Sequence, residues 1–421
     1  MSSLVSILTV SAGNFIGMIA SAIALIIYSR FMGPAEFGLF SVAFAFMQIV
    51  VRIADFGTNM AAERTIARAY DHQSRRDGLI QTTLWLKTIS YLAILILMWY
   101  LAPWIALDLL HLNNIGLIRS AVLLSGGTIV FEYAILVFQA THRFDLVARI
   151  TIAQGLGKLL FSLLLIWQGL LNSFLGLLIY GILPGIGALL GFVKKPLPSF
   201  SLPSRWRIHL TEIISVAKWT AVAALALTVA DNLDILMVQS LMSNYDAGIW
   251  SGAVRLATFA NLVGWSIGSV LNVRVARYSH IDHLGEYLRK AWKLSLVVFL
   301  GLLATIPLAR FAIDYSIGAS YALATLPLQI LLISISISGA TVPYIALFYV
   351  FDSPQYYAIS GIMQTVLLIL GDLYFIPRYG LLGSAWVRVA VRLILFIFTL
   401  YYAKKSYNHH FSSRNLQASL V

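Results

Sequence analysis

Two arginines four residues apart, Arg388 and Arg392, are the residues of this sequence best suited to binding an anion. They lie in a long apolar stretch, and a spacing of four places them on one face of a helix. Two guanidiniums side by side repel one another unless something anionic lies between them, and the planar fork of arginine matches phosphate oxygens. The pair therefore predicts either a phosphate-binding surface or a buried pairing with acids of a neighbouring helix.

Other basic residues also fall inside apolar stretches, namely Arg52, Arg255, Lys87, Lys158 and Lys218. An ionised side chain at the centre of a bilayer costs about 2.5–3.5 kcal/mol on insertion scales, so each needs a compensating interaction. A cationic surface for an anionic substrate is one explanation, and snorkelling of long side chains toward the headgroups is the other. For Arg52, a local ion pair with Asp55 three residues further on is a third explanation.

Four embedded acids are candidates for coupling transport to an ion gradient. Asp231 and Asp234 share a helix face at a spacing of three, where two close carboxylates suit a proton or Na⁺ site. Glu132, central in its apolar stretch, and Asp55 are separate candidates. The alternative is that these acids neutralise embedded cations such as Arg255. A fifth acid, Asp372, lies near the end of a stretch and is expected to be hydrated.

Enzyme chemistry finds little support in this sequence. The absence of cysteine excludes a thiol nucleophile, a disulfide and Cys-ligated metals. The eight histidines fall in loops or at stretch ends, with no helical pair spaced for a metal, and there is no P-loop. We therefore predict no catalytic residue, no metal site and no bound cofactor. A proton or Na⁺ gradient is the expected energy source if one is used.

The elements that must position these residues are membrane-spanning helices. Hydrophobic residues make up 60% of the 421 residues and charged residues only 11%, whereas soluble domains are about 25% charged. Stretches of about 20 apolar residues span a bilayer as helices, and they lack the alternation of barrel strands. The sequence predicts an all-α integral membrane protein with twelve spans: Ile7–Tyr28, Phe37–Met60, Leu79–Leu101, Ala121–Ala140, Leu146–Trp167, Leu170–Val193, Thr211–Gln239, Ala247–Val273, Ala291–Leu308, Ala322–Val350, Tyr357–Ile376 and Leu381–Tyr402.

Basic residues in the predicted loops are divided unequally between the two sides. Loops on the side of the N-terminus hold 18 lysines and arginines, and those on the other side hold 4. Positive residues concentrate in cytoplasmic loops, so both termini are expected in the cytoplasm. One inner loop, near Asp352, has no basic residue and does not follow the rule. The net charge of +12 is thereby explained without a nucleic-acid partner.

The chain also resembles a duplication. Residues 32–41 align without gaps onto residues 242–251 at an offset of 210, with Gly38 on Gly248, and Arg64 falls on Arg274. Each copy follows the first span of a six-helix half, so the halves are expected in parallel, related by a pseudo-two-fold axis along the membrane normal. The predicted organisation is residues 1–193, a basic cytoplasmic linker 194–209, residues 210–403 and a cytoplasmic tail 404–421.

Several short motifs resemble those of Wzx-type flippases in the multidrug/oligosaccharidyl-lipid/polysaccharide exporter superfamily. They are residues 30–40 (RFMGPAEFGLF), 55–57 (DFG), 63–76, 139–144 (QATHRF) and 245–253 (YDAGIWSGA). The resemblance implies a bacterial inner-membrane protein that turns a polyprenyl-pyrophosphate-linked oligosaccharide to the outer leaflet by alternating access, for surface polysaccharide or O-antigen synthesis. Its implied partners are this lipid-linked substrate, membrane lipids and other polysaccharide-assembly proteins.

Other functions remain open alternatives. A multidrug exporter of the same superfamily that handles cationic drugs should favour acids, whereas seven embedded cations outnumber five embedded acids here. A lipid II flippase usually carries two additional helices. A membrane polysaccharide polymerase or ligase typically carries a large outer loop with functional arginines and histidines, and the outer connections of this chain are short.

Overall fold

The structure, a computed structural model, describes residues 3–194, 201–275, 282–350 and 355–418. These residues form helices and short turns, with no strand among them, which confirms the all-α prediction. The chain divides into two compact units, residues 1–248 and 249–421. The predicted boundary at the basic linker 194–209 stays a prediction.

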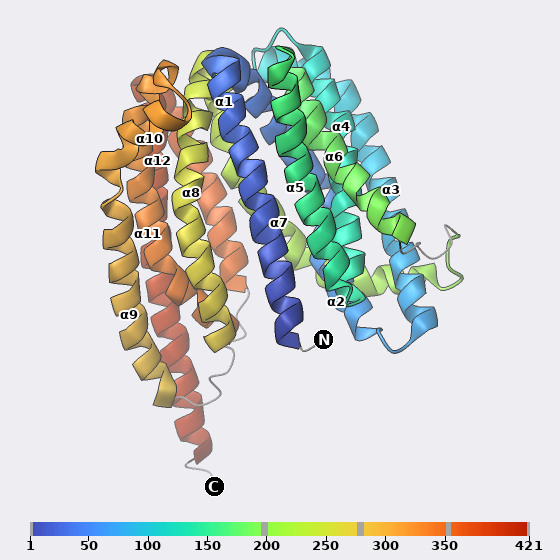
Figure 1. The fold of residues 1–421 in the computed structure, drawn as a ribbon. Coiled ribbons are helices and arrows are strands. Elements are labelled where there is room, and N and C mark those ends of the chain that lie inside the picture. The colour runs from blue at the N-terminus through green and yellow to red at the C-terminus, as the bar shows by residue number, and fades with distance from the viewer. Residues whose placement is uncertain (1–2, 195–200, 276–281, 351–354, 419–421) are drawn as a thin grey trace. The chain divides into compact units, whose positions relative to one another are not determined.

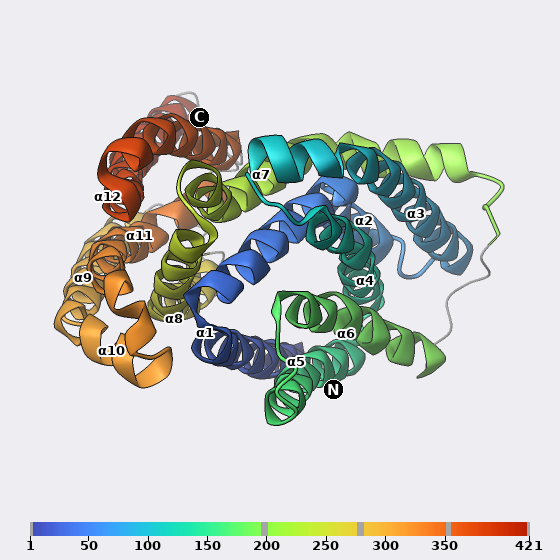
Figure 2. The same ribbon diagram turned by 90° about the horizontal axis from the view of Figure 1, so that it is seen from above.

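The first unit is a bundle of long helices (Figure 1). Helix α1 packs along α5, α4 packs along α6, and α7 packs against α1, α2 and α3 (Figure 2). A π-helical turn, Ile105–Leu109, continues α3. The helices are α1 (Ser3–Asp55), α2 (Thr58–Arg68), α3 (Gln73–Trp104), α4 (Ile115–Ala140), α5 (Phe144–Trp167), α6 (Ser173–Lys194), α7 (Trp206–Leu241) and the first turn of α8 (Asn244–Val275).

The second unit contains the rest of α8 and the helices that follow it. Helix α11 packs against α9 and α12, and the Ser295 hydroxyl of α9 donates to the carbonyl of Ala340 in α11 at 2.8 Å. The elements are α9 (Asp282–Leu303), a 3₁₀ turn (Ile306–Leu308), α10 (Ala309–Ser316), a second 3₁₀ segment (Ala319–Ala324), α11 (Thr325–Val350) and α12 (Gln355–Ala418).

Within the described residues, nine helical stretches are long and apolar enough to cross a membrane. The first, Phe15–Asp55, and the last, Ile359–Tyr402, have 41 and 44 residues, about twice the length of one span. Each is bent at a glycine with positive φ, Gly33 (72°) and Gly380 (57°), so each accounts for two predicted spans. The twelve spans and the cytoplasmic termini themselves stay predictions.

The bend at Gly33 also ties α1 to α6. Positive φ favours glycine, and Pro34 directly after it begins the next helical run. One turn later, the Glu36 carboxylate accepts a hydrogen bond from the backbone N–H of Ser173, the first residue of α6, at 2.7 Å. A carboxylate at a helix N-terminus satisfies a free N–H and favours the helix dipole. The motif around Glu36 is therefore structural.

The two copies of the predicted repeat meet at matching residues within the first unit. A methyl group added to Gly38 would overlap the carbonyl oxygen of Asn244, and one added to Gly248 would overlap that of Pro34. Pro34 and Asn244 are themselves related by the offset of 210, so the contact is reciprocal. Reciprocal contacts are what a two-fold relation produces, and this one supports the parallel duplication.

Candidate functional site

A break in the second predicted span organises the charged residues of the first unit. Helix α1 ends at Asp55 and α2 begins at Thr58, while Phe56 (φ 48°) and Gly57 (φ 68°) both adopt left-handed backbone. The Thr58 hydroxyl donates to the carbonyl of Asp55 at 2.6 Å and contacts its carboxylate at 3.2 Å. The apolar pattern predicted one continuous helix here, and Gly57 was the only signal against it, because a glycine inside a helical pattern weakens the helix.

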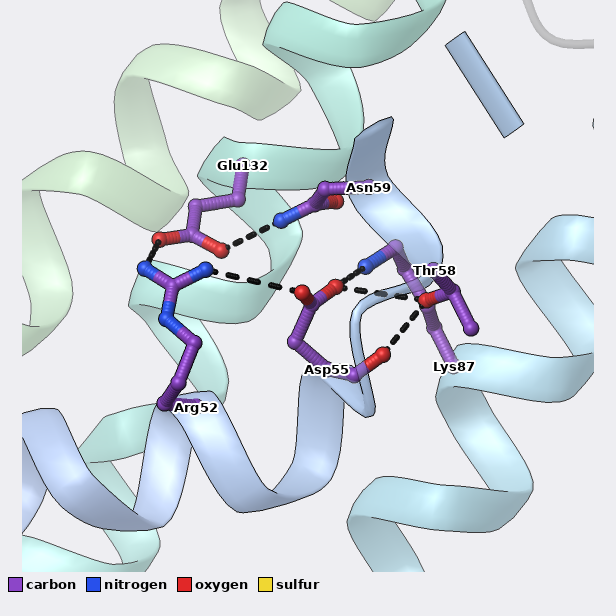
Figure 3. A network of polar contacts seen from close by, with 6 residues as sticks. All are labelled: Arg52, Asp55, Thr58, Asn59, Lys87 and Glu132. Carbon is purple, nitrogen blue, oxygen red and sulfur yellow. Dashed lines mark hydrogen bonds and ion pairs between the residues drawn. The ribbon is translucent and has the colours of Figure 1, made fainter. Parts of the chain in front are cut away.

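Six residues beside the break form one polar network (Figure 3). Asp55 accepts from Lys87 Nζ at 2.6 Å and from Arg52 Nη1 at 3.5 Å. Arg52 Nη2 also reaches Glu132 at 3.2 Å, and the Asn59 amide donates to the other oxygen of Glu132 at 2.7 Å. The network thus joins α1, α2, α3 and α4, and contains four of the sequence-predicted site residues.

The formal charges in this network cancel, because two cations meet two acids. Its ends differ in exposure: the side chains of Lys87 and Asp55 are 4% and 2% exposed, whereas those of Arg52 and Glu132 are 25% and 24% exposed. The local pair of Arg52 with Asp55 that the spacing predicted is present. Arg52 and Lys87, considered with their partners, form a neutral cluster and not a positive surface.

Lys158 has a different environment from the network cations. Only 8% exposed on α5, it places its ammonium 4.7 Å from the ring centre of Tyr180 in α6. No carboxylate of the described residues lies within 4 Å of its ammonium. The ring belongs to an aromatic cluster with Tyr28, Phe40 and Phe44. Lys158 is thus a buried cation held by an aromatic face.

The two acids of α7 do not share one environment. Asp231 is exposed, whereas Asp234 is 1% exposed and its carboxylate accepts the backbone N–H of Ile235 at 3.1 Å. The spacing placed both on one side of the helix but could not assign their depth in the protein. The side chain of Lys218, also on α7, lies outside the described residues.

In the second unit, the contacts of the paired arginines of α12 include an aromatic ring and an amide. Arg388 lies 6.0 Å from the ring centre of Trp250 in α8, and Arg392 donates to the amide oxygen of Gln364 at 3.2 Å. Both arginines are half-buried, as is Arg255 on α8. These three arginines lie on α8 and α12, and whether they face a substrate stays a prediction.

The expected hydration of Asp372 was wrong. This residue is fully buried (0% exposed) within α12, beside Gly371, which packs against Val387 of the same long helix. The error arose because depth was inferred from distance to the end of an apolar stretch, and α12 continues through that end. Asp372 is therefore a buried acid of the same unit as Arg388 and Arg392.

Comparisons with known proteins agree with this architecture. A family model described as polysaccharide biosynthesis protein matches residues 3–272. No curated protein sequence matches the chain. Among solved structures, the lipid II flippase MurJ in an inward closed conformation has a TM-score of 0.75 at 14% identity, covering 94% of this chain and 88% of that chain.

Two further structures are transporters. An inward-facing multidrug resistance MATE family transporter of the MOP superfamily has a TM-score of 0.74 at 15% identity, covering 93% of this chain and 95% of that one. A MOP superfamily transporter from Pyrococcus furiosus, described as having a binding pocket of reverse polarity, has a TM-score of 0.65 at 15% identity, with coverage of 95% and 96%. At such identities the likeness establishes the fold, not the substrate.

Proposed function

This chain belongs to the polysaccharide biosynthesis protein family, and from that membership we propose that it turns a polyprenyl-pyrophosphate-linked oligosaccharide from the inner to the outer leaflet of a bacterial inner membrane. It is a multi-pass membrane protein with the fold of MOP-superfamily transporters. One structural neighbour is a flippase of lipid II, which supports a lipid-linked cargo. In this proposal the chain is a transporter without catalytic residues, working beside other polysaccharide-assembly proteins.

The observation that carries the proposal is the buried cation Lys158, which rests on the ring of Tyr180 and has no carboxylate of the described residues within 4 Å of its ammonium. Arg388 and Arg392 add two more basic side chains at membrane depth on α12. A cation inside the membrane costs free energy, so its presence there favours a role in binding an anionic group that crosses the membrane. Arginine binds phosphate oxygens bidentately, and a pyrophosphate offers several of them.

The residues have different roles in this proposal. The pyrophosphate or the sugars contact four basic residues, each within its own unit: Lys158, Arg255, Arg388 and Arg392. Lys218 is a further predicted contact. Arg52 and Lys87 are also predicted substrate contacts, and in this structure both pair with acids. The acids that would bind or release a proton or Na⁺ during the cycle are Asp55, Glu132, Asp231 and Asp234.

The charge of the cargo separates this function from multidrug export, because the fold is common to both. Arg388→Ala or Arg392→Ala should reduce surface polysaccharide export at least tenfold while the protein still reaches the membrane. Arg378→Ala is the matched control, since Arg378 is exposed and packs on Tyr374 at 3.8 Å. Full export by the Arg388→Ala/Arg392→Ala double variant would contradict the proposal, and resistance to cationic drugs conferred by the wild-type chain would favour the multidrug alternative.

A further inference from the structure

Arg52 bridges two acids that depend on it to different extents. Asp55 has Lys87 at 2.6 Å in addition to Arg52 at 3.5 Å. Glu132 has Arg52 at 3.2 Å as its cation among the described residues, together with the neutral amide of Asn59 at 2.7 Å. If Arg52 moved away, Asp55 would keep a close ammonium and Glu132 would lose its counter-charge.

Arg52 is also the more exposed and less closely bound cation of this network. Its contacts of 3.2 and 3.5 Å are longer than the 2.7–2.9 Å typical of charge-assisted hydrogen bonds, whereas the Lys87 contact is short. Its Nε is buried without a hydrogen-bond acceptor among the described residues. Its side chain is 25% exposed, against 4% for Lys87. A guanidinium held this loosely can turn toward another anion.

We infer that Arg52 exchanges partners, leaving Glu132 for a phosphate oxygen of the substrate while Glu132 takes up a proton from water. The inference rests on the proposed function, because that function supplies the anionic headgroup. A carboxylate in a low-dielectric site with no nearby cation is more stable when protonated. The substrate then neutralises Arg52, Lys87 neutralises Asp55, and the proton neutralises Glu132. When the substrate leaves, Arg52 returns and the proton is released.

The groups around Glu132 fit this exchange. Glu132 accepts from Arg52 of α1 and from Asn59 of α2, while Lys87 of α3 holds Asp55. The other helices packed on α4 carry Lys158 on α5 and Tyr180 on α6, which contact one another, and the Tyr180 hydroxyl donates to the carbonyl of Ser21. Of the described residues, Arg52 is the cation that donates a hydrogen bond to Glu132.

The test counts protons during binding. The full chain in neutral phosphatidylcholine vesicles is titrated with farnesyl pyrophosphate, a sugar-free pyrophosphate lipid, and with uncharged farnesol as control. Calorimetry in buffers of different ionisation enthalpy gives the protons taken up per bound probe. Glu132→Gln preserves the side-chain shape and is expected to bind the probe with proton uptake reduced by nearly one relative to wild type. The difference between the two proteins cancels the titration of the probe itself.

Two controls separate the possible outcomes. Glu63→Gln removes an acid one helical turn from Asn59 but outside the network, and should keep the wild-type proton uptake. In wild type alone, affinity for the pyrophosphate should rise as the pH falls, because binding and protonation are linked. Equal proton uptake in wild type and Glu132→Gln, or a wild-type affinity independent of pH, would overturn the exchange and leave the proposed function standing. Equal binding of farnesol and farnesyl pyrophosphate by wild type would overturn the proposed function itself.

Discussion

Asp55 and Lys87 show how a charged residue is tolerated deep in this membrane protein. Each side chain is almost fully buried, and their 2.6 Å contact is reinforced by Thr58 on one side and Arg52 on the other. Removing two charges from water is costly, and their mutual attraction offsets that cost only with good geometry and further hydrogen bonds. Loss of one partner leaves the other buried and uncompensated.

We therefore predict that Lys87→Met lowers the free energy of unfolding by about 3–5 kcal/mol, the usual effect of breaking a buried ion pair. The matched control is Arg310→Met, because Arg310 pairs with Asp314 at 2.7 Å but both side chains are exposed. Exposed pairs contribute about 0–1 kcal/mol. Thermal unfolding of the detergent-solubilised variants measures both effects. Similar losses of stability in the two variants would show that burial does not set the strength of the pair between Lys87 and Asp55.

The separation of two residues along the chain decides whether their contact in this network could be predicted from the sequence. The pair of Arg52 with Asp55 is local, three residues apart on one helix, and its spacing indicated it. The contacts of Lys87 with Asp55 and of Arg52 with Glu132 join residues 32 and 80 positions apart. The sequence does not indicate that α3 and α4 contact the end of α1. These two pairs could therefore be identified only in the three-dimensional structure.

His209, at the start of α7 before the predicted span, provides a prediction about pH. Burial lowers the pKa of this imidazole from its ordinary value of 6.5; Glu212 opposes the shift, and Arg75 and Arg205 add to it. The folded protein thus favours neutral His209, and as the pH falls through about 6.5 the unfolded chain binds a proton more readily than the folded one. Stability should therefore decrease on acidification, and His209→Gln should reduce the drop in melting temperature between about pH 7.5 and 5.5. An equal drop in wild type and variant would contradict this.

At the scale of elements, the positions of the helices could be predicted from the lengths of the apolar stretches in the sequence. The predicted spans fall largely on helical residues because a chain in lipid must satisfy its own backbone hydrogen bonds. The sixth span begins three residues before its helix, the ninth runs past the end of α9, and in the interior of the second span Phe56 and Gly57 break the helix beside Asp55. Apolar length cannot reveal such a break, since the same residues are apolar on either side of it.

Gly57 should be the residue on which this break depends. Its positive φ disfavours any side chain, and a methyl group there would also overlap the backbone of Ala221 in α7. Gly169 is the matched control, because its φ of 68° equals that of Gly57 but nothing lies within 4 Å of an added methyl group. Gly169→Ala should cost about 1–2 kcal/mol from backbone strain alone, and Gly57→Ala clearly more. Unfolding measurements that rank the two variants equally would show that α7 moves away without cost.

At the scale of the molecule, the reciprocal contact of Gly38 and Gly248 supports the sequence repeat. Either glycine changed to alanine would push a methyl group into the backbone of the opposite copy. We predict that Gly38→Ala and Gly248→Ala lower the melting temperature by similar amounts, because the contact is the same from both sides. Gly301→Ala, with open space around the added methyl group, should leave it unchanged or raise it. A large effect of only one of the two would contradict the reciprocity.

The orientation of the chain in the membrane can be tested directly because the sequence contains no cysteine. Single cysteines at Ser74 and Asn113, both exposed near opposite ends of α3, would report opposite sides of the membrane. The 18 to 4 division of basic residues predicts that Ser74→Cys reacts with a membrane-impermeant maleimide only after cells are permeabilised, whereas Asn113→Cys reacts in intact cells. The reverse labelling pattern would contradict the predicted cytoplasmic termini, and labelling of both sites in intact cells would show that they do not lie on opposite sides of the membrane.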